Sequence, residues 1–256
     1  MSAEPGAGRP KWEAGLVIGG GHVADYPGAD QSHTRGLVAP VFIYRGPVLR
    51  VDAGGIHGRL LNTPDWEFDL TGNAAFNARS NDARAGMPGL DYLFGVGPQL
   101  IYKGLRRRLG GPTLHLKARS VFSTDFHRIN GRGATFNPEV RWRLQPLAGS
   151  PVLLTLSVEP SWATESLQRY FYEVQPGDAT PQRPAYTARA GYLGTQLALS
   201  LSHQRSDSLE WFFTARALSL HGAANADSPL MRASTNFSIG AGIVWTPWRS
   251  QARAAD

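Results

Sequence analysis

Long stretches in which apolar and polar residues alternate constrain the fold of this chain more than any other feature. In one stretch, Trp66, Phe68 and Leu70 alternate with Glu67 and Asp69. Because successive side chains of a β-strand point to opposite faces, this pattern predicts a strand with one apolar and one polar face. The same period of two recurs over 114–119, 134–144, 152–159 and 237–245.

Two all-β architectures fit this alternation. In a soluble sandwich the apolar faces form the core, whereas in a membrane barrel they meet lipid and the polar faces line the lumen. The barrel is favoured because the stretches are long enough to cross hydrocarbon as tilted strands and because the polar faces carry both charge signs. Aromatic residues also lie near the ends of the apolar faces, as interfacial girdles require. They are Trp66, Phe76, Trp142, Trp162, Trp245 and Trp248.

The composition agrees with a barrel. Charged residues make up 18% of the chain, whereas about a quarter is usual for a soluble domain. No window approaches the roughly 18 apolar residues of a membrane-spanning helix. Cysteine is absent, which excludes disulfides and thiolate metal sites. The net charge of +6 would permit nucleic-acid binding, but the basic residues are scattered. Their one tight run, 106–108, is expected to be a solvated or lipopolysaccharide-facing loop.

We therefore expect one antiparallel transmembrane β-barrel of about 10–12 strands, in contact with lipid and lipopolysaccharide in the outer membrane of a Gram-negative bacterium. The expected strands are 12–23, 35–45, 47–60, 65–77, 91–103, 112–123, 132–145, 151–162, 184–192, 195–205, 208–220 and 235–247. With this count, the long connections (24–34, 78–90, 163–183 and 221–234) do not all fall on one side of the membrane.

The barrel domain is expected to span 12–248, after an N-terminal periplasmic segment over 1–11 and before a polar tail over 249–256. The first residues lack the basic and apolar regions of a signal peptide. An outer-membrane protein requires such a peptide for export, so the chain is interpreted as the mature form from which it has been removed.

Several short segments carry a family resemblance when they are taken in order. The most specific reads Ala-Arg-Ala-Gly-Met-Pro-Gly-Leu-Asp over 83–91, and others lie at 25–30, 97–98 and 227–230. Together they resemble the MipA/OmpV family, although Ala29 and Tyr172 depart from its usual Ser and Gly. The motif residues are Asp25, Tyr26, Gly28, Arg84, Gly86, Met87, Pro88, Leu90, Asp91, Gly97, Pro98, Asp227, Ser228 and Pro229.

These motifs admit two interpretations. Proline and glycine form turns, so the segments could fix the shape of the loops. This structural interpretation is favoured; the alternative is that they form a docking surface. The resemblance implies a non-enzymatic outer-membrane scaffold that brings a lytic transglycosylase together with a peptidoglycan synthase, which is a penicillin-binding protein.

The polar faces of the expected strands supply candidate lumen-lining residues: Arg50, Asp52, Glu67, Asp69, His115, Lys117, Arg119, Glu139, Arg141, Arg143, Glu159 and Arg216. In a narrow barrel these side chains could close the lumen with ion pairs. Because positive members outnumber negative ones, they could instead line a small channel for anionic solutes. That channel is the alternative function.

A third hypothesis, a lipid-modifying enzyme of the outer membrane, depends on a single pair of residues. Asp125 and His127 are the nearest approach to an acid–base pair, and the seven histidines show no zinc-ligand spacing. Neighbouring loop residues rarely form a catalytic site by themselves. We expect no enzyme activity and no cofactor or metal.

Overall fold

The computed structural model describes residues 10–45, 49–52, 55–58, 61–75, 77–78, 80–144 and 151–252. For the described residues between 43 and 62, and for Leu109, it describes the backbone alone. Phe76, one of the expected girdle aromatics, lies outside these ranges.

Thirteen strands form one antiparallel sheet over the described residues, and ten of them are ten residues or longer. The long strands are β1 (Trp12–Ala24), β2 (Ser32–Arg45), β6 (Trp66–Ala75), β7 (Tyr92–Tyr102), β8 (Thr113–Thr124), β9 (Ile129–Leu144), β10 (Val152–Ala163), β11 (Gly191–Ser206), β12 (Leu209–Ser219) and β13 (Thr235–Arg249). The short strands are β3 (Leu49–Asp52), β4 (Gly55–Gly58) and β5 (Leu61–Asn62). The helices are η1 (Asp82–Arg84), α1 (Gly104–Leu109), α2 (Glu165–Tyr172) and η2 (Pro176–Asp178).

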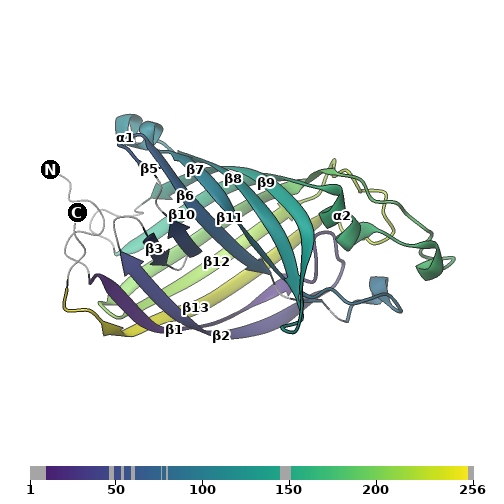
Figure 1. Ribbon diagram of the computed structural model, residues 1–256, viewed down its shortest axis with the longest axis horizontal. Coiled ribbons are helices and arrows are strands. Elements are labelled where there is room, and N and C mark those ends of the chain that lie inside the picture. Colours follow the sequence, from purple (N-terminus) through teal and green to yellow (C-terminus); the bar gives the residue numbers. More distant parts are fainter. Residues whose placement is uncertain are drawn as a thin grey trace.

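The sheet curls into a barrel because its first and last long strands pair with each other (Figure 1). β1 pairs with β13 from Glu13↔Arg249 to His22↔Ile239, and the remaining long strands follow in sequence order. The two ends of the sheet are β4 and β5, and β4 lies in contact with β6. The prediction of an antiparallel barrel with about 10–12 strands is confirmed.

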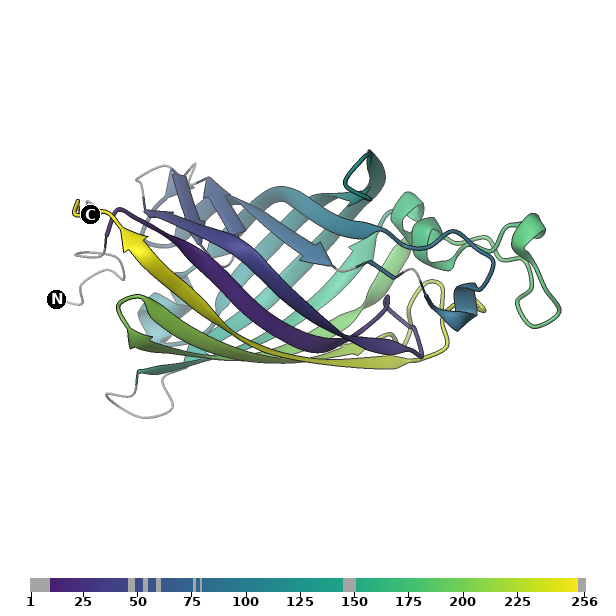
Figure 2. The ribbon, with the colours of Figure 1, turned by 90° about the horizontal axis from the view of Figure 1, so that it is seen from below.

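Five connections lie at one end of the barrel, which we call the loop end, and three of them, β6–β7, β10–β11 and β12–β13, are the longest between consecutive strands. The other two join β1 to β2 and β8 to β9, the latter through residues 125–128. The two chain termini lie at the opposite end, the terminus end, with the short connections and α1 (Figures 1 and 2). A membrane barrel has this asymmetry, with short turns on its periplasmic side and long loops outside.

Two expected strands were wrong, and they explain why the sequence did not place the loops together. Residues 184–190 form no strand; they belong to the β10–β11 connection, where Val174 and Tyr186 form an isolated bridge. The expected strand 47–60 contains the separate short strands β3 and β4, which pair with each other. At its end, β13 continues through Arg249, one residue into the predicted tail.

Along the long strands, over the residues whose side chains the structure describes, the predicted alternation of apolar and polar faces is present. Outward apolar residues such as Leu116 (47% exposed) and Ile239 (55%) alternate with polar residues that point inward, such as Lys117 (4%). No helix among the described residues is long and apolar enough to span a membrane.

Two girdles of aromatic side chains bound this apolar belt. Pairs near the terminus end include Trp66 with Tyr102, whose ring centroids are 4.7 Å apart, and near the loop end Phe94 with Phe122, 5.3 Å apart. Amphipathic aromatic rings favour the membrane–water interface, so the girdles place the hydrocarbon layer between them. The first girdle comprises Trp12, Trp66, Tyr102, Trp211, Trp245 and Trp248, and the second Tyr92, Phe94, Phe122, Phe136, Trp162 and Tyr192.

Replacing Gly97 by Val is expected to destabilise the barrel. A Cβ atom there would lie 1.9 Å from the carbonyl oxygen of Ala118 on the neighbouring strand, so the strands would have to separate. Overpacking of this kind costs about 1–3 kcal/mol, measurable as a lower urea midpoint in detergent. Gly131→Val is the matched control, since a Cβ at Gly131 meets nothing within 4 Å. Equal midpoints for the two variants would contradict the packing of β7 against β8.

Candidate functional site

Inward polar side chains of β6 to β10 form a continuous surface inside the barrel, which we call the charged wall. Ladder pairing sets its geometry, because His115 is opposite Glu139 and Lys117 is opposite Asn137. The side chains of His115, Lys117 and Glu139 face the interior of the barrel. Each of these residues is nevertheless only 4% exposed. Since an unpaired buried charge is costly, the wall must satisfy its own charges.

Lys117 forms the centre of the charged wall. Its Nζ contacts a carboxylate oxygen of Glu139 and lies 2.6 Å from Oε2 of Glu159. Arg141 donates two hydrogen bonds to the same Glu139 carboxylate, at 2.9 and 2.8 Å. Two carboxylates and two cations from three adjacent strands therefore form one ion-pair network.

Neutral polar groups extend the wall on both sides of this network. Nε2 of His115 lies 2.9 Å from Oγ1 of Thr113, and the amide of Gln99 donates to Asp69 at 3.2 Å. Asn137 donates to the hydroxyl of Ser161 at 2.6 Å. The sequence analysis did not single out Thr113, Gln99 or Asn137, although each occupies a polar position of the alternating pattern.

The opposite wall of the lumen carries small side chains. Gly19 is opposite Gly242, and Ala198 and Ser238 flank Arg216, which points inward and is exposed. A Cβ on Gly242 would lie 2.8 Å from the Phe212 ring. The lumen is thus asymmetric, with the ion-pair network on one side and, on the other, small residues beside the longer side chains of Phe212 and Arg216.

The structure places the sequence-predicted lumen residues as follows. The ion-pair network brings together Lys117, Glu139, Arg141 and Glu159, and Arg143 follows on the same face of β9, opposite Thr155. Glu67 lies nearer the terminus end, where its carboxylate is 3.2 Å from Nζ of Lys103. The remaining members are Asp69, His115 and Arg119, which are buried on the charged wall, Arg216 on the opposite wall, and Arg50 and Asp52, whose side chains lie outside the described residues.

At the loop end, the long connections pack against one another through both polar and apolar side chains. We call this assembly the loop cap. It comprises the described residues of 25–31, 77–91, 164–190 and 220–234. Tyr26, Leu90, Phe171 and Tyr172 are buried in one apolar cluster of this cap. The outward apolar side chains of the strands meet lipid and not one another. The loop cap therefore contains the kind of buried apolar cluster that a soluble domain has at its centre.

Buried hydroxyl groups connect the segments of the cap. Tyr172 donates to the carbonyl oxygen of Pro27 at 2.8 Å, and Tyr26 donates to that of Leu230 at 2.8 Å. The hydroxyl of Ser228 donates to the carbonyl oxygen of Tyr172, also at 2.8 Å. Three connections far apart in sequence are therefore fixed to one another.

Two buried arginines serve the same purpose. Arg84 donates to the carbonyl oxygens of Phe171 and Pro88 at 2.9 and 3.2 Å. Arg183 donates to those of Ala83 and Ala85 at 3.0 and 2.9 Å. Arg183 was missed because a single arginine in a long connection carries no sequence pattern.

The motif residues are gathered in the cap, with two exceptions. Gly28 has φ +88°, which favours glycine, and its N–H donates to Asn236 at 2.7 Å. Gly97 and Pro98 instead lie within β7. The other motif residues belong to the cap or to its edge with β7: Asp25, Tyr26, Arg84, Gly86, Met87, Pro88, Leu90, Asp91, Asp227, Ser228 and Pro229.

Asp125 and His127 form a turn. One carboxylate oxygen of Asp125 accepts the backbone N–H groups of His127 and Arg128 at 2.9 and 2.8 Å. These backbone hydrogen bonds hold the pKa of Asp125 below its ordinary value. The carboxylate is therefore engaged in shaping the β8–β9 connection, which explains the spacing of the pair.

The chain matches the family described as MltA-interacting protein MipA over residues 16–247. It belongs to the MipA family. That match covers the barrel from β1 to β13, and with the two girdles it makes the chain an outer-membrane β-barrel. No match was found among curated proteins.

Two solved membrane proteins are similar to this MipA-family chain at low identity. The Pseudomonas putida toluene transporter TodX is 10% identical, with 95% of this chain and 71% of that chain covered and a TM-score of 0.29. The CymD monoaromatic hydrocarbon channel is 8% identical, with 94% and 68% covered and a TM-score of 0.27. Similarity at this level indicates no shared function.

Replacing Lys117 by Met is expected to destabilise this MipA-family barrel strongly. The change removes a cation that both Glu139 and Glu159 contact, and a broken buried ion pair costs about 3–5 kcal/mol. Urea unfolding in detergent should show a lower midpoint. Adding Glu159→Gln should restore part of the stability, since Glu139 keeps Arg141 as its partner and the carboxylate that lost its cation is then neutral. A midpoint that this substitution lowers further would contradict the network.

The loop cap is expected to lose stability at alkaline pH. Burial raises the pKa of Tyr26 from 10 to about 12. The unfolded phenol therefore ionises before the folded one, and the free energy of unfolding falls as pH rises from 10 to about 12. Burial raises the pKa of Tyr172 in the same direction. Tyr26→Phe should make this fall shallower, measured by urea unfolding at several pH values. An unchanged slope would contradict the assignment.

Proposed function

We propose that this MipA-family barrel is a non-enzymatic anchor in the outer membrane of a Gram-negative bacterium. It holds a lytic transglycosylase, and through that enzyme a penicillin-binding protein, at the periplasmic face of the membrane. The family description, which names an interaction with MltA, supports a partner of this kind.

The observation that carries the proposal is the asymmetry of the barrel. Long connections lie at the loop end, and both termini and the short connections lie at the terminus end (Figures 1 and 2). In an outer-membrane barrel the terminus end faces the periplasm. A peptidoglycan enzyme works in that compartment, so its docking surface belongs at the terminus end. This differs from the docking surface that the sequence analysis considered for the family motifs, most of which lie in the loop cap.

The feature best placed for docking is α1, between β7 and β8. It carries Arg106, Arg107 and Arg108 in its last turn. Asp65 fixes the orientation of the helix, because its two carboxylate oxygens lie 2.8 Å from Arg107 and 3.0 Å from Arg108. Arg106 is exposed and can meet an acidic surface on a partner.

Arg106→Glu is expected to weaken binding of the purified lytic transglycosylase from the same organism. Reversing a charge at the edge of an interface slows association and makes it less salt-dependent. Biosensor measurements with the barrel in nanodiscs would report both quantities. The matched control is Arg128→Glu, which reverses an exposed charge at the loop end. Loss of binding in the control alone, or in neither variant, would contradict docking at α1.

A narrow channel is the second candidate, and the asymmetric lumen favours it. Arg216 is exposed inside the barrel beside Ala198, so the small-residue wall leaves it accessible to solutes. If solutes pass, Arg216→Glu should shift the ion selectivity of single channels in planar bilayers from anions towards cations. Absence of any conductance, also when Tyr172→Ala loosens the loop cap, would exclude this function.

A further inference from the structure

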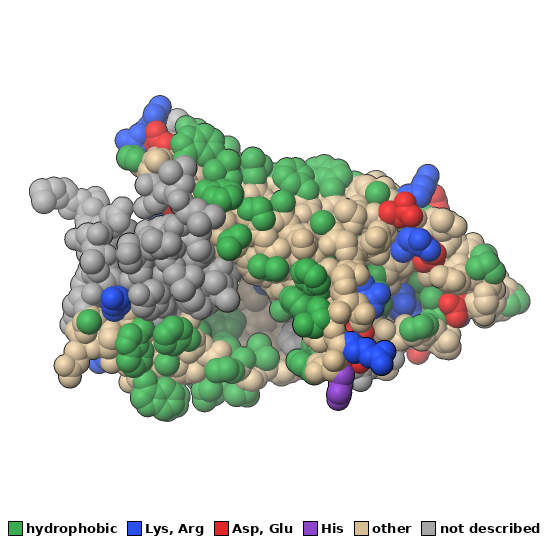
Figure 3. All heavy atoms as spheres, viewed as in Figure 1, with side chains coloured by type: hydrophobic (Ala, Val, Ile, Leu, Met, Phe, Trp, Pro, Cys, Tyr) green, Lys and Arg blue, Asp and Glu red, His purple; other side chains and the backbone are tan. Residues whose placement is uncertain are grey.

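The loop-end girdle changes its chemistry at β1 and β2. Towards the loop end, the hydrophobic outer surface of the strands gives way to charged side chains (Figure 3). Aromatic residues mark this boundary on β7 to β11, and Phe237 (70% exposed) continues them on β13. At the loop-end tips of β1 and β2 the sequence has no Phe, Tyr or Trp, and it has His22, Ser32 and Thr34 instead. We call these three residues the outer polar trio.

The register of β1 with β2 shows that the outer polar trio faces lipid. Trp12 and Phe42, whose stacked rings are 6.4 Å apart, mark the outward face near the terminus end. The ladder between the two strands has no shift over its length, so every second residue stays on that face. His22 is opposite Thr34 and lies on this face, as does Ser32, and all three are exposed. Polar side chains on a lipid-facing surface are favourable only at the level of the headgroups.

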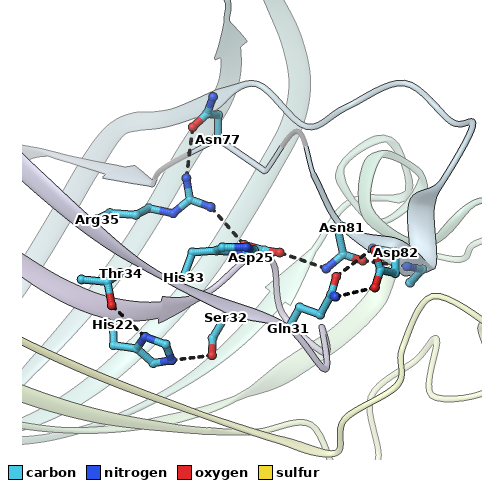
Figure 4. A network of polar contacts seen from close by, with 11 residues as sticks. His22, Asp25, Gln31, Ser32, His33, Thr34, Arg35, Asn77, Asn81 and Asp82 are labelled. Carbon is cyan, nitrogen blue, oxygen red and sulfur yellow. Dashed lines mark hydrogen bonds and ion pairs between the residues drawn. The ribbon is translucent and has the colours of Figure 1, made fainter.

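The imidazole of His22 joins the two hydroxyl groups of the trio (Figure 4). Its Nε2 lies 2.6 Å from Oγ of Ser32, and its Nδ1 lies 3.2 Å from Oγ1 of Thr34. Within the described part of the chain, neither hydroxyl has another partner. When both ring nitrogens carry a proton, each hydroxyl accepts from the ring, and its own O–H can donate to an outside acceptor. The trio then presents a positive charge and two donors together, which suits a phosphate group.

A separate set of contacts, on the inner side, holds this hairpin in place (Figure 4). Asp25 has a side chain that is 1% exposed, and its Oδ1 lies 2.7 Å from Nδ1 of His33 and accepts from Arg35 at 3.0 Å. Its other oxygen accepts from Asn81, in the β6–β7 connection, at 3.0 Å. Residues 33 and 35 therefore anchor the hairpin from within, and the alternate residues of the trio are positioned without having to hold the fold.

Next to the trio, on the side of the terminus end, the outer surface forms a shallow recess. Gly20 is opposite Gly36 on one side and opposite Ala241 of β13 on the other. A Cβ on Gly36 would meet only a backbone oxygen, 3.9 Å away, and one on Gly20 would meet only backbone atoms of the neighbouring strand. Val38 (68% exposed) and Ile239 (55%) lie two residues along β2 and β13, at the edges of the recess. Apolar walls around bare backbone suit a hydrocarbon chain.

We propose that the outer polar trio and this recess form a binding site for one lipid A molecule of the outer leaflet. A phosphate of lipid A lies on the trio, and one of its acyl chains lies over Gly20 and Gly36. The loop end faces outside, where lipopolysaccharide forms the leaflet, and lipid A carries phosphate and acyl chains on one molecule. The proposal rests on the orientation of the barrel in the proposed function and is independent of the periplasmic partner.

Native mass spectrometry of the full chain in detergent tests the polar half of the site. The probes are phosphorylated lipid A, the same lipid A without its phosphates, and phosphatidylglycerol, each added in a titration. We expect each barrel to retain one phosphorylated lipid A and to bind the other two lipids more weakly. His22→Leu should weaken binding of phosphorylated lipid A about tenfold, because charge-assisted hydrogen bonds are lost. The matched control is His127→Leu, which replaces another exposed histidine at the loop end and should leave binding unchanged.

Three results of this titration would overturn the proposal. They are equal binding of the phosphorylated and dephosphorylated forms, equal binding by the His22→Leu and unchanged chains, and binding of phosphatidylglycerol as tight as that of lipid A. Because the assay is made in detergent, its outcome does not depend on the orientation of the barrel. Its failure can therefore be distinguished from failure of the proposed function.

Gly36→Val tests the apolar half of the site. The added side chain fills the recess without a backbone clash and leaves the trio intact, so it should weaken binding of lipid A. Gly131→Val is the matched control, since a side chain there also meets nothing within 4 Å but lies on β9. Migration on semi-native gels before and after boiling confirms that each variant is folded. Unchanged binding of lipid A by folded Gly36→Val would overturn the placement of the acyl chain.

Discussion

The structure depends on one constraint: backbone N–H and C=O groups within hydrocarbon must be paired by the chain itself. A closed antiparallel sheet meets this requirement while leaving one face of every strand to lipid. Pairing of β1 with β13 joins the first and last long strands, and the described sheet ends at β4 and β5, with β4 in contact with β6. The apolar side chains are then committed to the outer surface, so the chain cannot also use them to build a central core.

Because the apolar side chains lie on the outer surface, two other sets of contacts stabilise the chain in place of a central core. Inside the barrel, the charged wall is held by the network around Lys117 and Glu139, in which each buried charge has an opposite partner. At the loop end, the cap assembles a compact apolar cluster around Tyr172. The family motifs at 25–30, 83–91 and 227–230 meet in this cap, which explains why turn-forming residues recur in a fixed order. Contacts among these segments support the interpretation that the motifs fix the shape of the loops, whereas docking of a partner at α1 is a proposal.

The sequence predicted the class of fold and the faces of the strands, because alternation reports directly which side chains share a face. It could not show which residues of different strands lie opposite each other. The contact of Lys117 with Glu159 joins residues 42 apart along the chain through the intervening strand β9. Which residues of two strands lie opposite each other depends on the register of the whole sheet, so no local sequence pattern predicts it.

The expected strand at 184–192 failed for a related reason. Ala188 and Tyr186 alternate with polar neighbours as strand residues do, but Ala188 is buried in the loop cap and Tyr186 packs against it. The alternating pattern of this segment therefore reflects burial against the loop cap and not the two faces of a strand. Counting that segment as a strand, and 47–60 as one strand, separated connections that the structure places at a single end.

Orientation in the membrane is the central claim, and labelling of single cysteines in intact cells tests it most directly. Gly177→Cys lies in η2 of the loop end, and Arg106→Cys lies in α1 at the terminus end. A membrane-impermeant maleimide should label position 177 in intact cells and position 106 only after the outer membrane is permeabilised. Labelling of position 106 in intact cells, with position 177 protected, would contradict the account.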